Sequence, residues 1–353
     1  MNTTKIKTIT SFLIINFSLL FFHCNAAIFN VSNLPGSPFP YNNVDAAMAV
    51  ANAGDSIYVH GSNIIYPDFS ITKSIVIIGA GGLPQTEFGF KSRFHRVTLT
   101  SNTSNIKIMG ISLVTYHLDF YNVSNVHNVL ISGNYFENNS YGNLRFENMN
   151  NSSDIRVFNN VFDGGGTNKI AFGSNTNCTN ISIDHNIING CIQNLNILNT
   201  LVQNNIFYNP QGGNAFAGSS SLMVLSNNIF FGADPKINNS SSIYNFNISY
   251  SASATLTAMG GTNFDNINPM FVNVPTSGNF TFSHNFNLQA GSPCIAAGGD
   301  GLDIGYYGGL ESVSPLSEPL NVPVIRMMNI QNTAVPQNGN VNVKVRSTKS
   351  RAN

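Results

Sequence analysis

The chain contains the stretch VLISGNYF at Val129–Phe136 and repeats its pattern as IRVFNNVF at Ile155–Phe162 and ISIDHNII at Ile181–Ile188. In each copy two apolar residues alternate with variable ones. A small or polar residue, an Asn, a variable residue and a large apolar residue follow. Alternation with a period of two is typical of a strand with one buried face. The repeat therefore predicts a β structure built from similar coils.

Weaker copies occur at Thr200–Phe207 and Met223–Phe230, and an earlier copy at Ile106–Leu113 has Ile111 in the Asn position. Stacking the copies gives an aliphatic column, an Asn column and a bulky column: Ile108, Ile131, Val157, Ile183, Val202 and Leu225; Asn134, Asn160, Asn186, Asn205 and Asn228; and Leu113, Phe136, Phe162, Ile188, Phe207 and Phe230. The asparagines are 26, 26, 19 and 23 residues apart. Such periods suit one turn of a parallel solenoid, in which like residues stack and Asn side chains form ladders.

A second strand recurs once in each period. Its expected copies are Val97–Leu99, Leu118–Phe120, Leu144–Phe146, Ile170–Phe172 and Leu195–Ile197. Phe120, Phe146 and Phe172 are 26 residues apart, in phase with the first strand. Because both strands recur with the same period, the sequence predicts an all-β fold, a parallel β-helix.

The two ends of the repeat contain different segments. Asn43–Asn52 (NVDAAMAVAN) predicts a short amphipathic helix that caps the first coil, followed by strands at Ser56–Val59 and Ser74–Ile78. Residues 266–309 break the pattern and are expected to close the other end, and residues 315–347 contain short strands between prolines. We expect this tail or long loops to cover apolar outward side chains of the first strand: Leu130, Phe158, Leu201 and Val224.

The N-terminus has the features of an export signal. Lys5 and Lys7 precede an apolar run from Ser11 to Phe22 that is short for a membrane span, and cleavage is expected after Ala26. A lipid anchor at Cys24 is the alternative. The expected organisation is a signal peptide at 1–26, a β-helix at 27–310 and a C-terminal segment at 311–353. Such a protein would be secreted or held at the cell surface.

Charged residues make up 9% of the chain and the net charge is zero. No basic stripe is therefore present to hold phosphates, and nucleic acid is not an expected partner. Trp is absent, which leaves Tyr and Phe for stacking on sugars. Cys178 and Cys191 fall in one coil and could form a disulfide, whereas the lack of a CxxC motif argues against a zinc site.

These repeats resemble those of the pectin-lyase-like right-handed parallel β-helix superfamily. The segment ANAGDSIYVHG at Ala51–Gly61 is similar to the usual first coil of that superfamily. Ser292-Pro-Cys-Ile295 and Asp303-Ile-Gly305 are similar to the end of many secreted bacterial β-helix proteins. The resemblance covers roughly residues 40 to 310 and implies a right-handed parallel β-helix. It leaves the function open, because the superfamily contains lyases, hydrolases, epimerases and adhesins.

Enzymes of this superfamily usually work on the outer face of a strand stack, which points to the outward positions of the second strand. The middle outward column is expected to contain Thr98, Asp119, Arg145, Ala171 and Asn196. The candidate catalytic residues are Arg145, Lys169, His117, Asp119 and Glu147, and the candidate substrate-binding residues are Arg96, Tyr121, Asn143 and Asn196. These charged side chains gather in a chain that has little charge elsewhere, and the resemblance to the superfamily implies that their ligand is a polysaccharide.

Two chemistries fit the cluster. In a lyase, Arg145 or Lys169 would neutralise the carboxylate of a uronic acid, and His117, Tyr121 or Lys169 would take the proton in a β-elimination. In a glycoside hydrolase, Asp119 and Glu147 would be the acid and the base, about 8 Å apart. The alternative is a charge network without catalysis that contains an Asp119–Arg145 pair.

No metal or other cofactor is expected. Ile183-Asp-His-Asn186 resembles a fragment of the pectate-lyase motif W-I-D-H, but Ser182 replaces the Trp and no further aspartates accompany it to hold calcium. Polygalacturonase motifs are absent from the sequence. The predicted function is binding of, or lyase or hydrolase action on, extracellular polysaccharide. A non-catalytic surface, adhesion or structural protein is the alternative.

Overall fold

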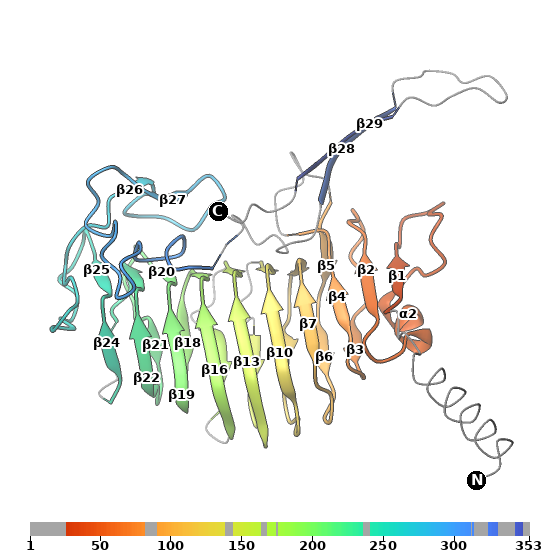
Figure 1. Cartoon of the computed structure of the whole chain (residues 1–353), viewed down its shortest axis with the longest axis horizontal. Helices are drawn as coiled ribbons and strands as arrows, with labels where there is room; N and C mark the ends of the chain where they lie inside the picture. The colour runs from red at the N-terminus through yellow and green to blue at the C-terminus, as the bar shows by residue number, and fades with distance from the viewer. Residues whose placement is uncertain are drawn as a thin grey trace, which may run out of the picture.

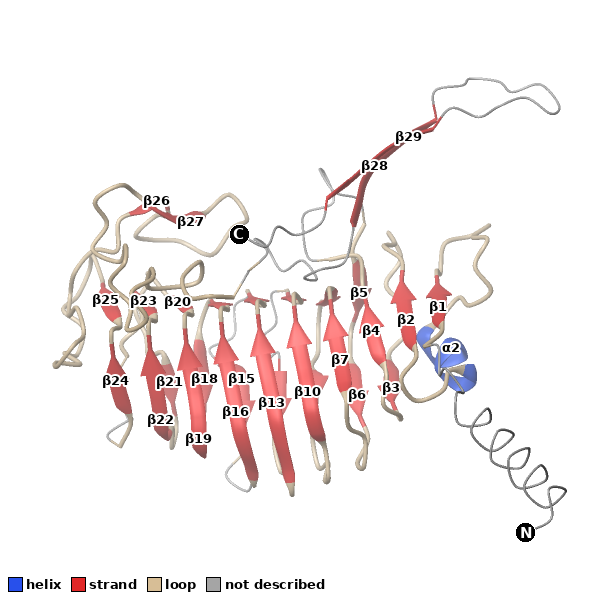
Figure 2. Ribbon diagram, in the orientation of Figure 1, coloured by secondary structure: helices blue, strands red, loops and turns tan. Residues whose placement is uncertain are grey.

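The computed structural model describes residues 26–81, 90–137, 144–163, 168–173, 176–235, 241–311 and 313, and the backbone of 324–330 and 343–348. The chain forms a parallel β-solenoid whose coils follow one another along the molecule (Figure 1). Figure 2 shows strands on every coil and a single helix among the described residues. The predicted fold class is confirmed, with three parallel sheets where the sequence indicated two strand stacks.

The ten-stranded sheet contains β1 (Ile28–Val31), β2 (Ser56–Val59), β4 (Val76–Ile78), β7 (Ile106–Met109), β10 (His127–Ser132), β13 (Ser152–Phe158), β16 (Cys178–Asp184), β19 (Asn196–Gln203), β22 (Ser221–Ser226) and β24 (Ile243–Asn245). The eight-stranded sheet contains β5 (Ser92–Phe94), β8 (Ile111–Leu113), β11 (Tyr135–Phe136), β14 (Val161–Phe162), β17 (Ile187–Ile188), β20 (Ile206–Tyr208), β23 (Ile229–Phe231) and β25 (Ile248–Tyr250). The seven-stranded sheet contains β3 (Phe69–Ile71), β6 (Val97–Leu99), β9 (Leu118–Asp119), β12 (Leu144–Phe146), β15 (Asn168–Phe172), β18 (Cys191–Gln193) and β21 (Phe216–Ala217).

Each sequence repeat spans two sheets, because the chain bends at the Asn. In the copy at 129–136 the first four residues belong to β10 and the last two to β11. The pairing register places equivalent residues of successive coils side by side. Ile131, for example, pairs with Ile108 and Val157. Phe136 pairs in the same way with the equivalent residues of its neighbouring coils. The predicted aliphatic and bulky columns are confirmed, and all of their side chains are buried.

The Asn column forms a ladder at the bend. Asn160 Nδ2 donates to Asn186 Oδ1 at 3.0 Å, and Asn160 Oδ1 accepts from the backbone N–H of Asn134 at 3.0 Å. The ladder consists of Asn134, Asn160, Asn186, Asn205, Asn228, Asn247 and Asn263. The sequence pattern missed its last two members. Each amide oxygen accepts from the backbone N–H of the preceding bend, and each Nδ2 also donates to a carbonyl of the strand in the preceding coil, so the ladder supplies partners to buried backbone groups at every bend.

The seven-stranded sheet contains the second strand of each coil. Leu118, Leu144 and Ile170 pair across it, as predicted. The prediction is wrong for the next coil, because β15 pairs with β18 and Ile192 rather than Leu195 follows Ile170. The Asn spacing in that coil is only 19 residues. The connection after the bend is therefore short, and the second strand begins earlier than the 26-residue period implies.

The N-terminal end is capped by α2 (Val44–Val50), which confirms the predicted helix. The backbone N–H of Ala46 donates to the side chain of Asn43, the residue before the first turn. Val44, Ala47 and Met48 are buried in the same core as the first coils. The helix therefore covers apolar side chains that the first coil would otherwise expose.

The segment at 264–311 begins on the last coil of the solenoid, where Phe264 pairs with Ile248 and the backbone N–H of Ile267 donates to the carbonyl oxygen of Ser249. It contains the antiparallel strands β26 (Phe271–Asn273) and β27 (Asn285–Leu288) and folds back over the eight-stranded sheet (Figure 1). One cluster joins Tyr135, Val161, Ile187, Ile206, Tyr208, Ile229, Phe231 and Ile248 of the sheet to Phe271, Phe280, Phe286, Cys294, Ile304 and Tyr306 of the segment. Most of the eight-stranded sheet is thus buried on both faces.

The predictions for the outward apolar side chains of the first strand are confirmed only in part. Phe158 is buried as expected, but Leu201 is 41% exposed, and Leu130 and Val224 are half-buried. Among the strands expected after residue 315, β28 (Val324–Ile330) and β29 (Val343–Thr348) form an antiparallel pair.

The described cysteines do not form a disulfide. Cys178, Cys191 and Cys294 are buried and free, so the bridge considered for Cys178 and Cys191 is absent. These two residues lie on β16 and β18, in different sheets. Residues 1–25 of the expected export signal lie outside the described residues. Within the described ranges, no helix has both the length and the apolar character needed to cross a membrane.

Candidate functional site

The outer face of the seven-stranded sheet has one continuous column of outward residues. From β3 to β21 the column consists of Ser70, Thr98, Asp119, Arg145, Ala171, Gln193 and Ala217. Gln193 takes the position predicted for Asn196. The prediction that Asn196 belongs to this face is wrong. Asn196 lies exposed on β19 of the ten-stranded sheet, where its side-chain oxygen accepts a hydrogen bond from the Ser221 hydroxyl.

Arg145 and Asp119 form the charged centre of this face, as the sequence predicted. Arg145 Nε lies 2.9 Å from Asp119 Oδ1, and Nη2 lies 2.6 Å from Oδ2, so both carboxylate oxygens accept from one guanidinium. The carboxylate is buried and the guanidinium is half-buried. The hydrogen bond to Asp119 raises the pKa of Arg145, although partial burial opposes the rise. Bidentate pairs of this kind fix both side chains in one orientation.

Aromatic rings flank the ion pair. The guanidinium carbon of Arg145 lies 4.6 Å from the ring centroid of Tyr121, and Arg96 lies 4.9 Å from that of Tyr116. The two tyrosines are 45% and 42% exposed. Cation–π contact holds each ring in place while part of it stays open to solvent. Tyr116 was not a candidate from the sequence, because it precedes the expected strand and its partner Arg96 belongs to another coil.

The two flanks of the face contain half-buried polar groups. His117 directly precedes β9 and Glu147 directly follows β12, so the sheet brings them to opposite flanks of the Asp119–Arg145 pair. Glu147 is close enough to raise the pKa of Arg145, as a smaller contribution after that of Asp119. The structure therefore brings together most of the predicted cluster. Asn143 lies outside the described residues.

The prediction that Lys169 is exposed on this face is wrong. Its side chain is fully buried, at a point where the pairing of β15 with β18 shifts register between Asn168 and Ile170. Burial lowers the pKa of its ammonium to about 8, and the nearby Asp163 opposes that shift. An irregularity of one residue in a ladder redirects the side chain at that point. Strand alternation alone does not indicate where such a shift occurs.

Asp184 and His185, which resemble the calcium-site fragment, instead hold the C-terminal segment. Both are buried. Asp184 Oδ1 accepts from Arg156 Nε at 3.0 Å, and His185 Nε2 lies 3.0 Å from the carbonyl oxygen of Gly308. Arg156 also pairs with Glu311 at 3.3 Å. We call these five residues the C-terminal clamp. Their contacts are structural ones between the solenoid and its covering segment.

The face can therefore offer stacking and hydrogen bonding to a ligand. Tyr116 and Tyr121 supply ring surface, and Thr98 and Gln193 supply hydroxyl and amide groups on either side of the ion pair. Within the parts of the chain that the structure describes, no group of three His, Cys, Asp or Glu side chains has an arrangement that could hold a metal ion.

Comparison with known proteins adds little to this geometry. No family model matches the chain, and no curated protein matches it. Among solved structures, the chain is similar to PfbA, a surface adhesin of Streptococcus pneumoniae, with a TM-score of 0.34 and 12% sequence identity, over 59% of this chain and 67% of that chain. The assignment of this chain to the parallel β-solenoids is based on the strand order and register of its own sheets.

Proposed function

We propose that the protein binds an extracellular polysaccharide along the outer face of the seven-stranded sheet and does not turn it over. The observation that carries this proposal is the exposed Tyr121 ring, held against the Arg145–Asp119 pair. A fixed, exposed aromatic ring beside polar groups suits a sugar, which has an apolar ring face and hydroxyls at its edge. Because the ring is already held in place by Arg145, little conformational freedom is lost on binding.

Binding fits the ion pair better than catalysis does. A lyase would need Arg145 to neutralise the carboxylate of the sugar, but Asp119 already balances the charge of Arg145 through a bidentate pair with Nε and Nη2. A hydrolase would need Asp119 to exchange a proton with substrate, but both carboxylate oxygens accept from Arg145. Lys169, which the lyase hypothesis includes as a cation or, with His117 and Tyr121, as a base, is fully buried.

The length of the face favours a polymer over a small sugar. Seven strands at about 4.8 Å spacing give the outward column a length of roughly 29 Å. Several sugar units in an extended chain can lie along such a surface. Export, a cell-surface location and membership of the pectin-lyase-like superfamily, all predicted from the sequence, are consistent with this function and remain part of the proposal.

Removing the exposed ring tests the proposal. We expect Tyr121→Ala to weaken binding to a recognised glycan about tenfold, since a stacked aromatic contributes roughly 0.5–1.5 kcal/mol beyond its buried area. The measurement is retention on an array of immobilised plant, algal and bacterial polysaccharides, followed by titration calorimetry. Leu198→Ala is the matched control, because it removes a side chain that is 63% exposed on the ten-stranded sheet. Equal loss in both variants would remove this face from the proposal.

A double variant of the Asp119–Arg145 pair tests whether the protein only binds the glycan or also cleaves it. The double variant Asp119→Asn with Arg145→Gln removes both charges and keeps neutral hydrogen-bonding groups at the two positions. We expect it to weaken binding, because Tyr121 loses the cation that holds its ring, and we expect neither protein to release unsaturated or reducing ends from any bound glycan. Product release that disappears in the double variant would establish an enzyme and contradict the non-catalytic proposal.

A further inference from the structure

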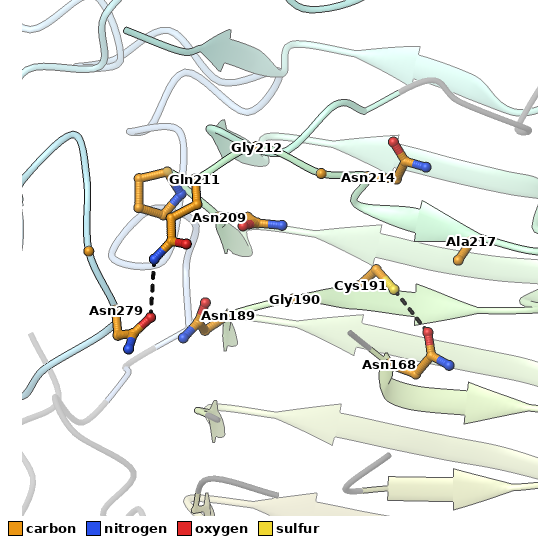
Figure 3. Close-up of a pocket in the computed structure, with 13 residues that line it drawn as sticks. Asn168, Asn189, Gly190, Cys191, Asn209, Gln211, Gly212, Asn214, Ala217 and Asn279 are labelled. Atoms are coloured by element: carbon orange, nitrogen blue, oxygen red, sulfur yellow. Dashed lines mark hydrogen bonds between the residues drawn. The ribbon is translucent and has the colours of Figure 1, made fainter. Parts of the chain in front are cut away.

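A pocket of about 610 Å³ lies at the other end of the same sheet. Asn168 of β15, Cys191 of β18 and Ala217 of β21 form its sheet side (Figure 3). The loop 209–214 between β20 and β21 and the loop 278–279 of the C-terminal segment form its rim. Three separate parts of the chain thus meet around one opening, and its volume lies in the range of roughly 300–1,000 Å³ typical of ligand pockets.

The lining of the pocket is rich in amides and uncharged. Its side-chain amides come from Asn168, Asn189, Asn209, Gln211, Asn214 and Asn279, and its remaining lining residues are glycines with Cys191, Pro210 and Ala217. Each carboxamide presents a donor and an acceptor, which matches a hydroxyl group that donates and accepts at once. A charged ligand would find no opposite charge among these side chains. The lining therefore favours a neutral ligand with many hydroxyls.

Two of these amides are free to meet a ligand. Among the described residues, the side chains of Asn209 and Asn214 have no hydrogen-bond partner, and both are half-buried. Gly213 allows this arrangement, because a Cβ at that position would lie 2.5 Å from Asn209 Nδ2. Its φ of +148 also belongs to a region that favours glycine. The loop backbone is thus shaped to leave room for the Asn209 amide.

The other amides brace the pocket. Gln211 Nε2 donates to Asn279 Oδ1 at 3.3 Å, which joins the loop 209–214 to the C-terminal segment (Figure 3). On the sheet side, Asn168 Nδ2 donates to Gln193 Oε1 at 2.7 Å. Gln193 belongs to the outward column that leads through Ala171 to Arg145. The pocket is therefore continuous with the face that carries Tyr121.

We infer that this pocket is a subsite for a neutral sugar unit, held by the amides of Asn209 and Asn214. The inference rests on the proposed function, because it places the unit at the end of a glycan that runs along the same face. It adds the class of ligand: the unit in the pocket is an uncharged hexose or pentose rather than a uronic acid. Specificity for a neutral glycan then comes from the pocket, and affinity for the chain comes from the tyrosines.

The test uses the whole mature protein and titration calorimetry. The probes are neutral hexasaccharides of glucose, mannose, galactose and xylose, and hexagalacturonate as the acidic probe, each at up to about 1 mM. We expect at least one neutral probe to bind and hexagalacturonate to bind at least tenfold more weakly. The variants are Asn209→Leu with Asn214→Leu, which removes the free amides, and Ala217→Phe, which fills the pocket from β21. Asn196→Leu is the matched control, because that exposed Asn lies on the ten-stranded sheet.

Each pocket variant should weaken binding of the neutral probe at least tenfold, whereas Asn196→Leu should leave it unchanged. If the pocket variants bind as the unaltered protein does while Tyr121→Ala weakens binding, the inference fails and the proposed function stands. If the pocket variants weaken binding and Tyr121→Ala does not, the pocket stands and the tyrosine face fails. Binding of the acidic probe alone, or of no probe, overturns the inference.

A labelling experiment covers the possibility that a pocket variant folds poorly. Ala217→Cys, made together with Cys191→Ser because Cys191 also lines the pocket, introduces one thiol at the pocket wall with little change in volume, while Cys178 and Cys294 are buried. The bound neutral hexasaccharide should slow maleimide labelling of this new thiol several-fold. A labelling rate that is unaffected by a saturating neutral probe contradicts occupation of the pocket.

Discussion

The Asn at each bend shows how one residue type can determine the path of the chain. Its amide donates to the next Asn and to a carbonyl of the preceding coil, and its oxygen accepts from a backbone N–H. Asp would supply no donors, and a buried stack of carboxylates would repel itself. Asn therefore supplies hydrogen bonds to the buried backbone groups of the bend without burying a charge. The sequence could predict this position because every coil needs the same hydrogen bonds.

Replacing one rung should be costly. We expect Asn160→Leu to lower the free energy of unfolding by about 1–3 kcal/mol, because it leaves the buried N–H of Asn134 without a partner. Urea denaturation followed by circular dichroism measures the change. The exposed substitution Asn196→Leu should shift the midpoint by much less. Similar shifts for the two variants would show that the ladder does not stabilise the coil.

Other residues of the candidate face could be predicted only where the period holds. Asp119 and Arg145 are 26 residues apart, and the structure pairs them as expected. Lys169 lies where β15 pairs irregularly with the following strand, and Asn196 lies in the short coil, so neither side chain is on the face. A period fixes the position of a side chain only when the number of residues between bends is constant.

Among the secondary structure elements, the short strands of the eight-stranded sheet contain a signal that the repeat analysis left unused. The position between the Asn and the bulky residue is variable in the repeat pattern, yet it is apolar or aromatic in successive coils: Tyr135, Val161, Ile187, Ile206 and Ile229. Apolar residues at both positions of a two-residue strand indicate burial on both faces. The C-terminal segment supplies the cover that this pattern requires.

The C-terminal clamp connects that cover to β13 and β16 and should make it sensitive to acid. Burial alone would raise the pKa of Asp184, but hydrogen bonds from His185 and Arg156 outweigh it and hold the pKa below the usual value for an aspartate. A carboxyl whose pKa is lower in the folded state contributes stability above its unfolded value, and this contribution is lost as the pH falls through the folded value.

We therefore expect Asp184→Asn to cost about 1.5–3 kcal/mol at neutral pH, the usual range for a charged hydrogen bond. The difference from the unaltered protein should persist down to about pH 4 and shrink below it. Thermal melting of both proteins between pH 3 and 7 measures this difference. A gap that stays constant over the whole range would mean that the charge of Asp184 does not contribute.

Over the whole molecule, each coil contacts mainly its neighbours, whereas the C-terminal segment contacts many coils at once. Its cluster includes side chains from β11 at one end to β25 at the other. Tyr306 donates to Asn159 Oδ1 at 2.5 Å, across 147 positions of sequence. Because the segment contains no repeat, no register could be predicted for it, and its place along the solenoid could be found only from the structure.

The last prediction follows from this arrangement. Ending the chain after Asn263 keeps the described solenoid and its Asn ladder but removes every covering side chain of the cluster. The outward residues of the eight-stranded sheet would then face water, at a cost of roughly 1.5–3 kcal/mol for each large apolar side chain exposed. We expect a shortened protein that keeps its β circular dichroism, binds a hydrophobic dye strongly, and melts at a clearly lower temperature. A chain that ends after Val313 is the control, since it retains the whole segment. If the shorter chain melts at the same temperature as this control and binds no dye, the segment is not part of the stabilising core, and the clamp and the pocket rim would have to be reconsidered together, because both depend on its position.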